Sequence, residues 1–415
     1  MANSDDKKPP APAAPAASAP TPAGIRRRDK FSSTLHLTPG TLELPPEMQA
    51  RLQPPKPGVP LPTAEHDAAA RVAREFDRLD LAAKRKLHWR RWGPYVSERQ
   101  WGTVREDYSA TGDAWNYFPF DHSHLRTYRW GEDGIGGICD NRQRLCWALA
   151  LWNGNDPILK ERMFGLAGPE GNHGEDPKEL YWYTDALPSH SYGKMVYKYP
   201  VARYPYEDLR QKNRRRSKAE PEYELQDTGV LEHGYFDTVI EHAKADVDDV
   251  LLRVTVTNRS PSAQTLHLLP TVWFRNTWSW DHDAPKPSIE RAPGGPDHGA
   301  LHLRHQSLGE RFYYAQNHGQ WLVTENESNG ERLGWWPQRT PRGHYKDAFA
   351  DAVIAGDAGA AQAATGTKAA SWHTLTLAAG ETAVVRLRLT NKASSAPFAD
   401  FEAVYADRLL DLEAF

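Results

Sequence analysis

The chain has 415 residues, with 51 Lys and Arg against 54 Asp and Glu, and its formal net charge of -3 excludes attraction to nucleic acid by bulk charge. No stretch approaches the roughly 20 consecutive apolar residues that a membrane helix needs. Its two cysteines, Cys139 and Cys146, are too few for a disulfide framework, so we expect a cytoplasmic protein with a pair of buried thiols.

Composition divides the chain into three segments. Residues 1–62 are rich in proline and alanine, and so many prolines prevent regular structure. We predict a disordered leader over 1–62, a β-sandwich domain with helical insertions over 63–395, and a helical linker over 396–415.

Three helices are expected in the first half. Val72, Phe76 and Leu79 lie on one face of a helix predicted over about 64–91, and this face would be the buried one. Leu145, Leu149 and Trp152 predict a second helix over 141–152, capped by Asp140. A proline after Asp156 and the glycine at 165 predict a short third helix between them.

The second half of the chain changes to the period of β-strands. Apolar and polar residues alternate over 252–257 and 266–268, on either side of a turn at 258–262. The same pattern recurs over 372–377 and 385–390, around a turn at Gly380. We interpret both as hairpins, and they predict a mainly β fold, a large antiparallel double sheet with helical insertions.

The last residues predict a helix with an apolar stripe. The stripe consists of Phe398, Phe401, Tyr405, Leu409 and Leu412, and no C-cap follows it. Such a helix is normally stabilised by packing its apolar face. It either folds back onto the sandwich or packs on a partner outside this sequence, and the pattern does not choose between them.

Motifs of several enzyme classes are absent from the sequence. There is no P-loop, no G-x-S-x-G, no H-E-x-x-H and no C-x-x-C. His122 and His124 beside Asp121 could bind a metal on one face of a strand, but among 17 histidines a chance pair is the favoured explanation. The basic run 210–218 could contact phosphates, although a solvated loop is the simpler interpretation. We expect no metal and no cofactor.

Tryptophans are concentrated in one segment, mixed with arginines and acids. They are Trp89, Trp92, Trp101, Trp115 and Trp130. Sugar sites use this mixture, because indole stacks on the apolar face of a pyranose while carboxylates and guanidinium groups bind its hydroxyls. A tryptophan-rich core with surface ion pairs would look the same. Acidic pairs such as Glu132/Asp133, Glu175/Asp176 and Asp281/Asp283 suggest glycosidase chemistry, but adjacency does not establish the required geometry.

Several segments resemble a known family. They are WGPYVSERQWGTVREDYS (92–109), YRWGEDGIGGICDNRQRLCWALALWNG (128–154), DPILKERMFGL (156–166), EGNHGED (170–176) and LPTVWFRNTWSW (269–280). Together they resemble the N-terminal half of bacterial glucosidase-like proteins related to glycoside hydrolase family 63. The resemblance covers about 64–415.

The resemblance implies a large β-sandwich that precedes an α/α toroid carrying both catalytic carboxylates of an inverting hydrolase. This sequence stops at Phe415, before such a toroid, so no catalytic residue of the family can be assigned here. By similarity the sandwich contributes to a cleft that binds an oligosaccharide. The residues expected to contact sugar are Trp101, Arg105, Arg129, Trp130, Glu132, Asp133, His173 and Glu175.

Three functions compete at this point. The first is a non-catalytic domain of a glucosidase, whose activity needs a separately encoded helical half. The second is a stand-alone carbohydrate-binding module. The third is an enzyme on its own sandwich, of the sugar-epimerase kind, with His173 and Glu175 as the acid and base. In each case the expected partner is an oligosaccharide, and neither nucleic acid nor a membrane is expected.

Overall fold

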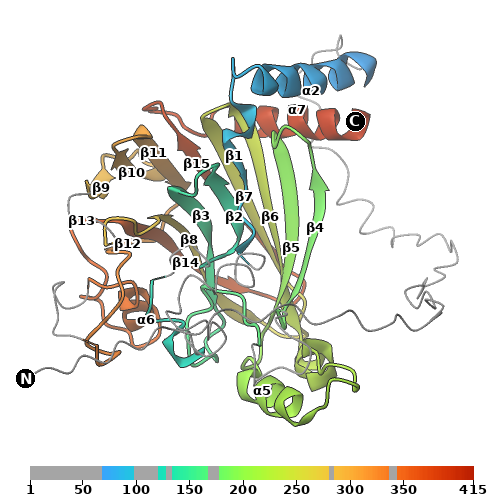
Figure 1. The fold of residues 1–415 in the computed structure, drawn as a ribbon, viewed down its shortest axis with the longest axis vertical. Helices are drawn as coiled ribbons and strands as arrows, with labels where there is room; N and C mark the ends of the chain where they lie inside the picture. Colours follow the sequence, from blue (N-terminus) through green and yellow to red (C-terminus); the bar gives the residue numbers. More distant parts are fainter. Residues whose placement is uncertain (1–67, 98–119, 128–132, 167–176, 280–284, 336–343) are drawn as a thin grey trace, which may run out of the picture. The chain divides into compact units, whose positions relative to one another are not determined.

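The fold was analysed in a computed structural model, which describes residues 68–97, 120–127, 133–166, 177–279, 285–335 and 344–415. The predicted leader 1–62 lies outside these ranges. In the described part of the chain two antiparallel sheets pack face to face (Figure 1). The expected mainly β double sheet with few helices is therefore confirmed. No helix in the described ranges is long and apolar enough to cross a membrane.

The smaller sheet has six strands in the described part of the chain. In spatial order they are β1 (Trp92–Pro94), β2 (Ile135–Asp140), β3 (Leu145–Trp152), β8 (Gln264–Phe274), β14 (Lys368–Leu377) and β12 (Gln320–Thr324). The larger sheet has nine described strands. These are β13 (Thr365–Gly366), β9 (Ser288–Ala292), β10 (His298–His305), β11 (Gly309–Gln316), β15 (Thr382–Thr390), β7 (Asp249–Asn258), β6 (Tyr235–Asp246), β5 (Tyr192–Pro200) and β4 (Leu180–Ala186).

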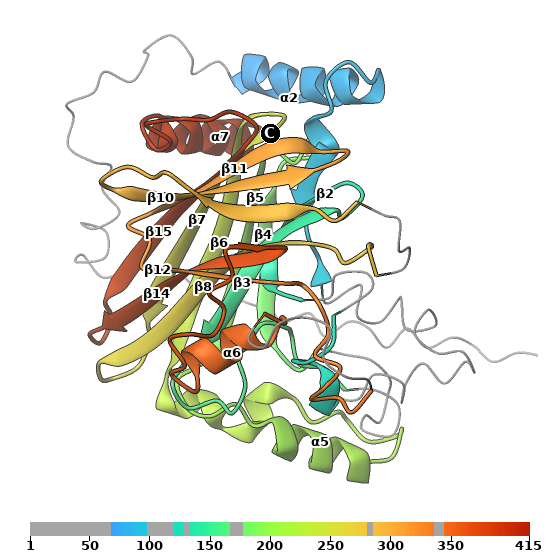
Figure 2. The same cartoon turned by 90° about the vertical axis from the view of Figure 1, so that its left-hand side faces the viewer.

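The helices of the described ranges lie outside the two sheets. They are α2 (Ala68–Ala83), α5 (Tyr206–Arg215), α6 (Ala348–Val353) and α7 (Phe401–Ala414), with short 3-10 turns η1 (Trp89–Arg91), η3 (Phe120–His122), η5 (Leu225–Thr228) and η6 (Val230–His233). Phe349 of α6 packs on Leu269 and Ala370, on the outer face of the smaller sheet (Figure 2). Phe401 and Tyr405 of α7 pack on Leu251, on the outer face of the larger sheet.

The main core lies between the sheets. Val250, Leu252, Val254 and Val256 alternate along β7 and are all fully buried, as a strand with one face inward requires. The predicted strands at 252–257, 266–268, 372–377 and 385–390 are therefore confirmed.

The two predicted hairpins are wrong. β7 pairs with β6 and β15, whereas β8 pairs with β3 and β14 in the other sheet. β14 and β15 are likewise divided between the sheets. Alternation shows which side of a strand is buried but not which strand it pairs with. Each connection therefore passes from one sheet to the other.

The helix predicted over 141–152 is also wrong, because Leu145–Trp152 is the strand β3. β3 lies inside the smaller sheet with both faces covered, so nearly all of its residues are buried. A continuous apolar run of this length has no period of two and fits a helix equally well. The short helix predicted after Asp156 is absent, since that described segment is irregular apart from isolated bridges. The basic run 210–218 begins inside helix α5 rather than in a loop.

The predicted first helix forms, but its buried face differs from the prediction. Arg71, Glu75 and Arg78 are buried in α2, while Phe76 is 56% exposed. The last helix folds back onto the sheet, one of the two outcomes left open. Tyr405 Oη donates to the carbonyls of Glu241 and Leu251 at 3.1 and 3.3 Å.

Candidate functional site

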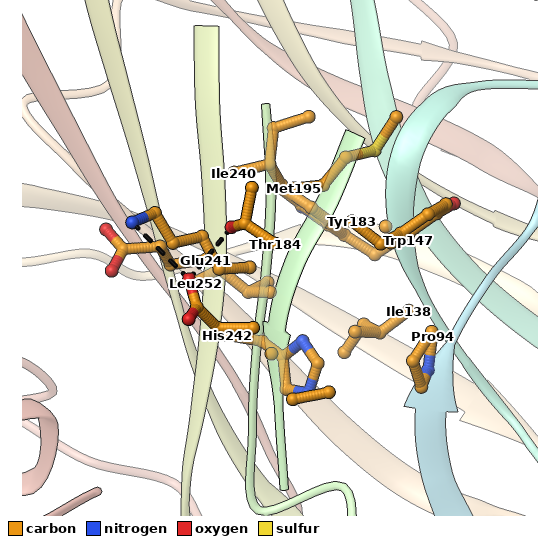
Figure 3. A pocket seen from close by; sticks show the side chains of 15 residues that line it. Pro94, Ile138, Trp147, Tyr183, Thr184, Met195, Ile240, Glu241, His242 and Leu252 are labelled. Carbon is orange, nitrogen blue, oxygen red and sulfur yellow. Dashed lines mark hydrogen bonds and ion pairs between the residues drawn. The ribbon is translucent and has the colours of Figure 1, made fainter. Parts of the chain in front are cut away.

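A cavity opens at one edge of the sandwich, between β1, β2 and β3 on one side and β4, β5 and β6 on the other (Figure 3). Its volume is about 170 Å³. Apolar side chains form most of its wall, and a few polar groups lie among them. The lining includes Pro94, Ile138, Trp147, Tyr183, Thr184, Asp185, Lys194, Met195, Ile240 and His242.

Glycines allow close packing around this cavity. A Cβ on Gly193 would lie 2.4 Å from Cε1 of His242, so the imidazole can lie against the β5 backbone only because residue 193 has no side chain. A Cβ on Gly136 would meet Ile240 at 2.6 Å and Met195 at 2.8 Å. The sequence therefore sets the two sheets close together at this edge.

Gly137 is the most constrained of the glycines that line the cavity. Its φ of +143° is one that other residues rarely adopt, and a Cβ there would lie 2.0 Å from the carbonyl oxygen of Trp147. We expect Gly137→Ala to lower the free energy of unfolding by about 2–3 kcal/mol in urea denaturation. Gly154→Ala is the control, because Gly154 also has positive φ but has nothing within 4 Å of its Cβ position. If both variants lose the same unfolding free energy, the close approach of a Cβ at position 137 to the carbonyl oxygen of Trp147 is not the cause of the loss.

Trp147 supplies a fixed aromatic wall. The residue is fully buried in β3, and its Nε1 donates to Oη of Tyr313 at 3.0 Å, which fixes the orientation of the indole. Tyr183 lines the same cavity (Figure 3) and remains 44% exposed on the edge strand β4. The two rings give the cavity one buried and one accessible aromatic surface.

His242 supplies a neutral polar group in the cavity wall. Burial, together with the positive charge of Lys244, lowers the pKa of His242 to about 3, so the ring is uncharged at physiological pH. Its Nε2 is buried and has no hydrogen-bond partner in the part of the chain that the structure describes. A neutral imidazole can exchange a hydrogen bond with a ligand hydroxyl without introducing a charge.

Charged groups lie at the rim. Asp185 Oδ2 accepts a hydrogen bond from Thr184 Oγ1 at 2.8 Å and lies 3.6 Å from Lys194 Nζ. These groups are partly exposed, so they can exchange their mutual contacts for contacts with a ligand at little cost. The cavity thus combines apolar walls with donors and acceptors at its mouth.

Glu241 also borders the cavity, but its carboxylate is already occupied. Arg253 donates to it from Nε at 2.8 Å and from Nη2 at 2.9 Å, and Tyr192 Oη donates at 2.7 Å. Burial would lower the pKa of Arg253, but the hydrogen bond and charge of Glu241 outweigh this and raise it. Glu241 is therefore held as an ion-pair partner.

A second group of charged residues is buried at Asp133. Lys346 Nζ donates to both oxygens of Asp133, at 3.0 and 2.9 Å, and Lys368 Nζ donates to Glu161 Oε2 at 2.6 Å. Burial raises the pKa of Asp133 to about 6, although Lys346 opposes the shift. Burial would also raise the pKa of Glu161, but Lys368 and Lys346 outweigh it and lower that pKa. We call these four residues the Asp133 cluster.

Of the eight residues expected to contact sugar, Asp133 alone lies within the described ranges. The other seven, Trp101, Arg105, Arg129, Trp130, Glu132, His173 and Glu175, lie outside them, as do Glu175/Asp176 and Asp281/Asp283. Their role stays a prediction. Asp133 is 6% exposed and held by Lys346.

Other predicted features have described positions. Trp92 belongs to the core, where its Nε1 donates to Asp248 at 2.9 Å. His122 and His124 lie in and just after η3 rather than in a strand, and no group of metal ligands occurs among the described residues. Cys139 and Cys146 are buried free thiols, as expected, and face one another across β2 and β3.

Neither composition nor motifs point to the residues of the edge cavity. His242 stands in a strand of mixed composition, and its partner position Gly193 is 49 residues away in the chain, so only strand pairing brings them together. The aromatic run at 181–183 was a usable signal, because adjacent exposed aromatics on a strand point to opposite faces.

No family model matches the chain. It is 39% identical over 360 residues to "Uncharacterized protein YMR196W" of Saccharomyces cerevisiae, an alignment that covers 78% of this chain and 33% of the relative. The chain thus spans about a third of the length of the curated relative it matches.

Two solved structures show a weaker likeness. A galactose mutarotase related enzyme from Lactobacillus acidophilus is 8% identical, with 63% of this chain and 96% of that chain covered and a TM-score of 0.27. A polysaccharide lyase is 12% identical, with 39% and 22% covered and a TM-score of 0.23. Both names refer to carbohydrates, but the TM-scores are too low to establish a common fold.

Proposed function

We propose that this chain is a sugar-binding β-sandwich, the non-catalytic part of a protein related to family 63 glucosidases, and that the edge cavity takes one sugar ring of an α-glucoside-type oligosaccharide. The single observation that carries the proposal is the composition of that cavity. Tyr183 offers an accessible aromatic surface, with Trp147 buried in the same wall, His242 offers an uncharged hydrogen-bonding group, and Asp185 and Lys194 lie at the mouth.

The size of the cavity supports a single small ring. Its volume of about 170 Å³ is several times the ~30 Å³ that one liquid water occupies. It is below the ~300–1,000 Å³ of sites that enclose drug-sized ligands. One ring of a longer sugar could enter while the remainder lies outside.

The carboxylates of the cavity support a non-catalytic role. Glycoside hydrolysis needs one carboxylic acid that donates a proton and one free carboxylate on the other side of the bond. Glu241 is bound by Arg253 and Tyr192, and Asp185 is paired with Lys194 and Thr184. Neither described carboxylate of the cavity is placed as a proton donor.

The family 63 assignment and the separate catalytic half are supported by the sequence resemblance. We also propose a cytoplasmic location. Cys139 and Cys146 are directly opposite in register and remain free thiols, which favours a reducing compartment.

The test is titration of the full chain with methyl α-glucopyranoside and methyl α-mannopyranoside by calorimetry. We expect saturable binding of the glucoside, and Tyr183→Ala should weaken it about five- to tenfold, because an aromatic contact contributes about 1–1.5 kcal/mol. Trp182→Ala is the matched control. Trp182 is the neighbouring exposed residue of β4, 47% exposed, and does not line the cavity.

The outcomes separate the parts of the proposal. Absence of saturable binding, or equal effects of the two variants, would reject the cavity as the sugar site. Turnover of p-nitrophenyl α-glucoside by the chain alone at an enzyme-like rate would reject the non-catalytic role while leaving the binding site intact.

A stand-alone carbohydrate-binding module is the second candidate. The observation that favours it is that Tyr183 lines the cavity and remains 44% exposed, so an aromatic surface is already accessible to a sugar. A stand-alone module should give the same titration result. Its affinity for oligosaccharide should not increase when a helical catalytic half is added.

A further inference from the structure

A second cavity, separate from the edge cavity, is lined by arginines. It has a volume of about 310 Å³ and lies where η1 and the β2–β3 turn of the smaller sheet approach β11 and the β10–β11 turn of the larger sheet. Its described polar lining includes Arg91, Asn141, Arg142, Arg144, Ser307 and Arg311. Four of these side chains are guanidinium groups, and no carboxylate is among the described residues that line it.

Two buried or partly buried carboxylates lie beside the arginines, but both are already engaged. Asp248 accepts from Arg91 Nη1 at 2.6 Å and lies 3.4 Å from Arg311 Nη2. Asp140 accepts from Arg144 Nε at 3.0 Å and from backbone amides of its own turn. Arg142 is exposed and forms no ion pair with a described carboxylate. The four arginines therefore exceed these two acids by two positive charges.

Arg311 shows that the excess charge is not fully compensated. The residue is 6% exposed, and its Nε is buried without a hydrogen-bond partner in the described part of the chain. Its Nη1 donates to the carbonyl of Glu310 at 2.8 Å. Burial lowers the pKa of Arg311, and Arg91 and Arg144 act in the same direction, against Asp248 and Asp140. A buried guanidinium N–H without an acceptor is costly, and Arg311 lines the cavity, so an acceptor that enters it and reaches this Nε would be stabilised.

We infer that this arginine cavity binds a phosphate group. Guanidinium groups bind phosphate oxygens through paired, charge-assisted hydrogen bonds, and a doubly charged anion matches an excess of two positive charges. Asn141 and Ser307 add uncharged polar groups at the same wall. The volume exceeds that of one small anion, so a phosphate ester with a small attached group would also fit.

The test is calorimetric titration of the full chain at pH 7.5 with inorganic phosphate, glycerol 3-phosphate and nitrate, at constant ionic strength set with sodium chloride. We expect saturable binding of the phosphates and none of the singly charged nitrate. Tighter binding of the ester than of inorganic phosphate would identify an ester as the ligand, and equal binding would identify free phosphate.

Two variants tie the binding to the cavity. Arg142→Ala removes an exposed guanidinium group and leaves no described carboxylate without its ion-pair partner. Arg311→Gln removes the buried guanidinium group. Each variant should weaken phosphate binding at least tenfold. Arg214→Ala, on the exposed side of α5, is the matched control and should bind as the unaltered chain does. Lack of saturable phosphate binding, or binding that Arg142→Ala leaves unchanged, would overturn the inference. Arg142→Ala keeps the test decisive if Arg311→Gln does not fold.

Discussion

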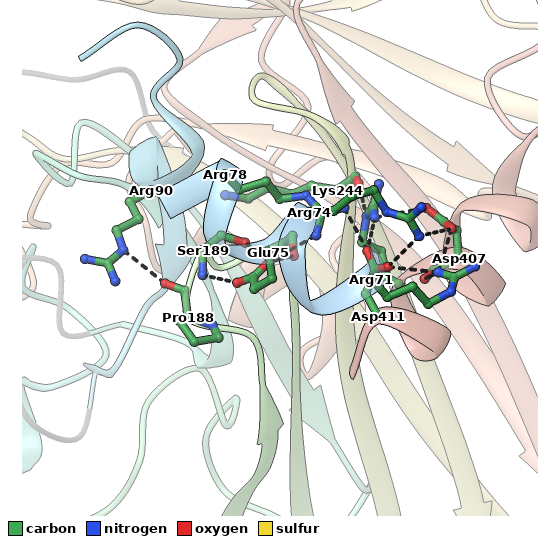
Figure 4. A network of polar contacts seen from close by, with 12 residues as sticks. Arg71, Arg74, Glu75, Arg78, Arg90, Pro188, Ser189, Lys244, Asp407 and Asp411 are labelled. Carbon is green, nitrogen blue, oxygen red and sulfur yellow. Dashed lines mark hydrogen bonds and ion pairs between the residues drawn. The ribbon is translucent and has the colours of Figure 1, made fainter. Parts of the chain in front are cut away.

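Replacing Asp411 with alanine is expected to lower the free energy of unfolding by about 3–5 kcal/mol, because it removes the buried carboxylate that four arginines share. The carboxylate of Asp411 is fully buried between α2 and α7 (Figure 4). It accepts from Arg71 at 2.8 Å, Arg78 at 2.7 Å, Arg74 at 3.2 Å and Arg408 at 2.5 Å. Urea denaturation at pH 7 measures the loss.

This carboxylate also joins distant parts of the chain. Arg78 links Asp411 to Glu75, at 3.0 Å, and Glu75 accepts from the backbone N–H of Ser189 at 2.7 Å. Arg408 Nε donates to the carbonyl of Lys244 in β6 at 2.9 Å. The two helices are therefore attached to each other and to the larger sheet by charges rather than by apolar contacts alone.

The pH dependence of this contribution follows from the pKa of Asp411. Burial would raise that pKa, but the hydrogen bond and charge of Arg78, with Arg408 and Arg74, outweigh burial and lower it. A folded-state pKa below the unfolded value of about 3.9 means that the stabilisation is fully present above pH ~4. It is lost as the pH falls through the folded-state pKa. The difference between Asp411→Ala and the unaltered chain should therefore be constant from pH 5 to 8 and shrink only in stronger acid.

Asp407→Ala is the matched control on the same helix. Asp407 also accepts from Arg71, at 3.0 Å, but its side chain is 40% exposed, and such pairs contribute about 0–1 kcal/mol. A loss of similar size in the two variants would mean that burial of Asp411 does not determine its contribution.

The same network explains why sequence predicted the helix α2 but not its orientation. Val72, Phe76 and Leu79 form an apolar stripe, and burial of such a stripe is the usual expectation. The opposite outcome arises because Arg71, Glu75 and Arg78 have partners on α7 and on the sheet, more than 100 residues away for Ser189 and more than 330 for Asp411. Local pattern contains no information about such partners.

The sheets show the same difference between local features, which the sequence predicts, and long-range contacts, which it does not. Period-two alternation identified the strands around 254 and 387 correctly, because one buried face is a local property. Strand pairing is not local, so two connections that looked like hairpins join different sheets. β3 was mistaken for a helix because its outer side is also covered, by α6 at Ala150 and by Tyr95 and Trp273 at Cys146 and Ala148, so it lacks the polar positions that alternation needs. Composition pointed to Asp133 of the Asp133 cluster. It did not point to His242 of the edge cavity, because the position of His242 against Gly193 depends on strand pairing.

Replacing Lys346 with methionine is expected to cost about 3–5 kcal/mol of unfolding free energy at pH 7.5, because it removes one of the two cations of the Asp133 cluster. Lys346 is fully buried, and its Nζ also donates to the carbonyl of Arg126 at 2.9 Å. In the variant, Lys368 is the lysine of the Asp133 cluster that remains opposite the carboxylates of Asp133 and Glu161. Lys392→Met, at an exposed lysine, is the control and should change stability by less than about 0.5 kcal/mol.

The loss in Lys346→Met should depend on pH, with a sign set by Asp133. Its folded-state pKa of about 6 lies above the unfolded value of about 3.9, so its ionised form destabilises the fold above pH ~6. This destabilisation disappears as the pH falls towards 4. Removing Lys346 takes away a charge that lowers this pKa, so the variant should regain more stability than the unaltered chain between pH 7.5 and 5. The double variant Asp133→Asn/Lys346→Met should lose this pH dependence, since the titrating group is gone. If Lys346→Met loses the same unfolding free energy at pH 7.5 and at pH 5, the ionised carboxylate of Asp133 is not the group that the variant leaves uncompensated.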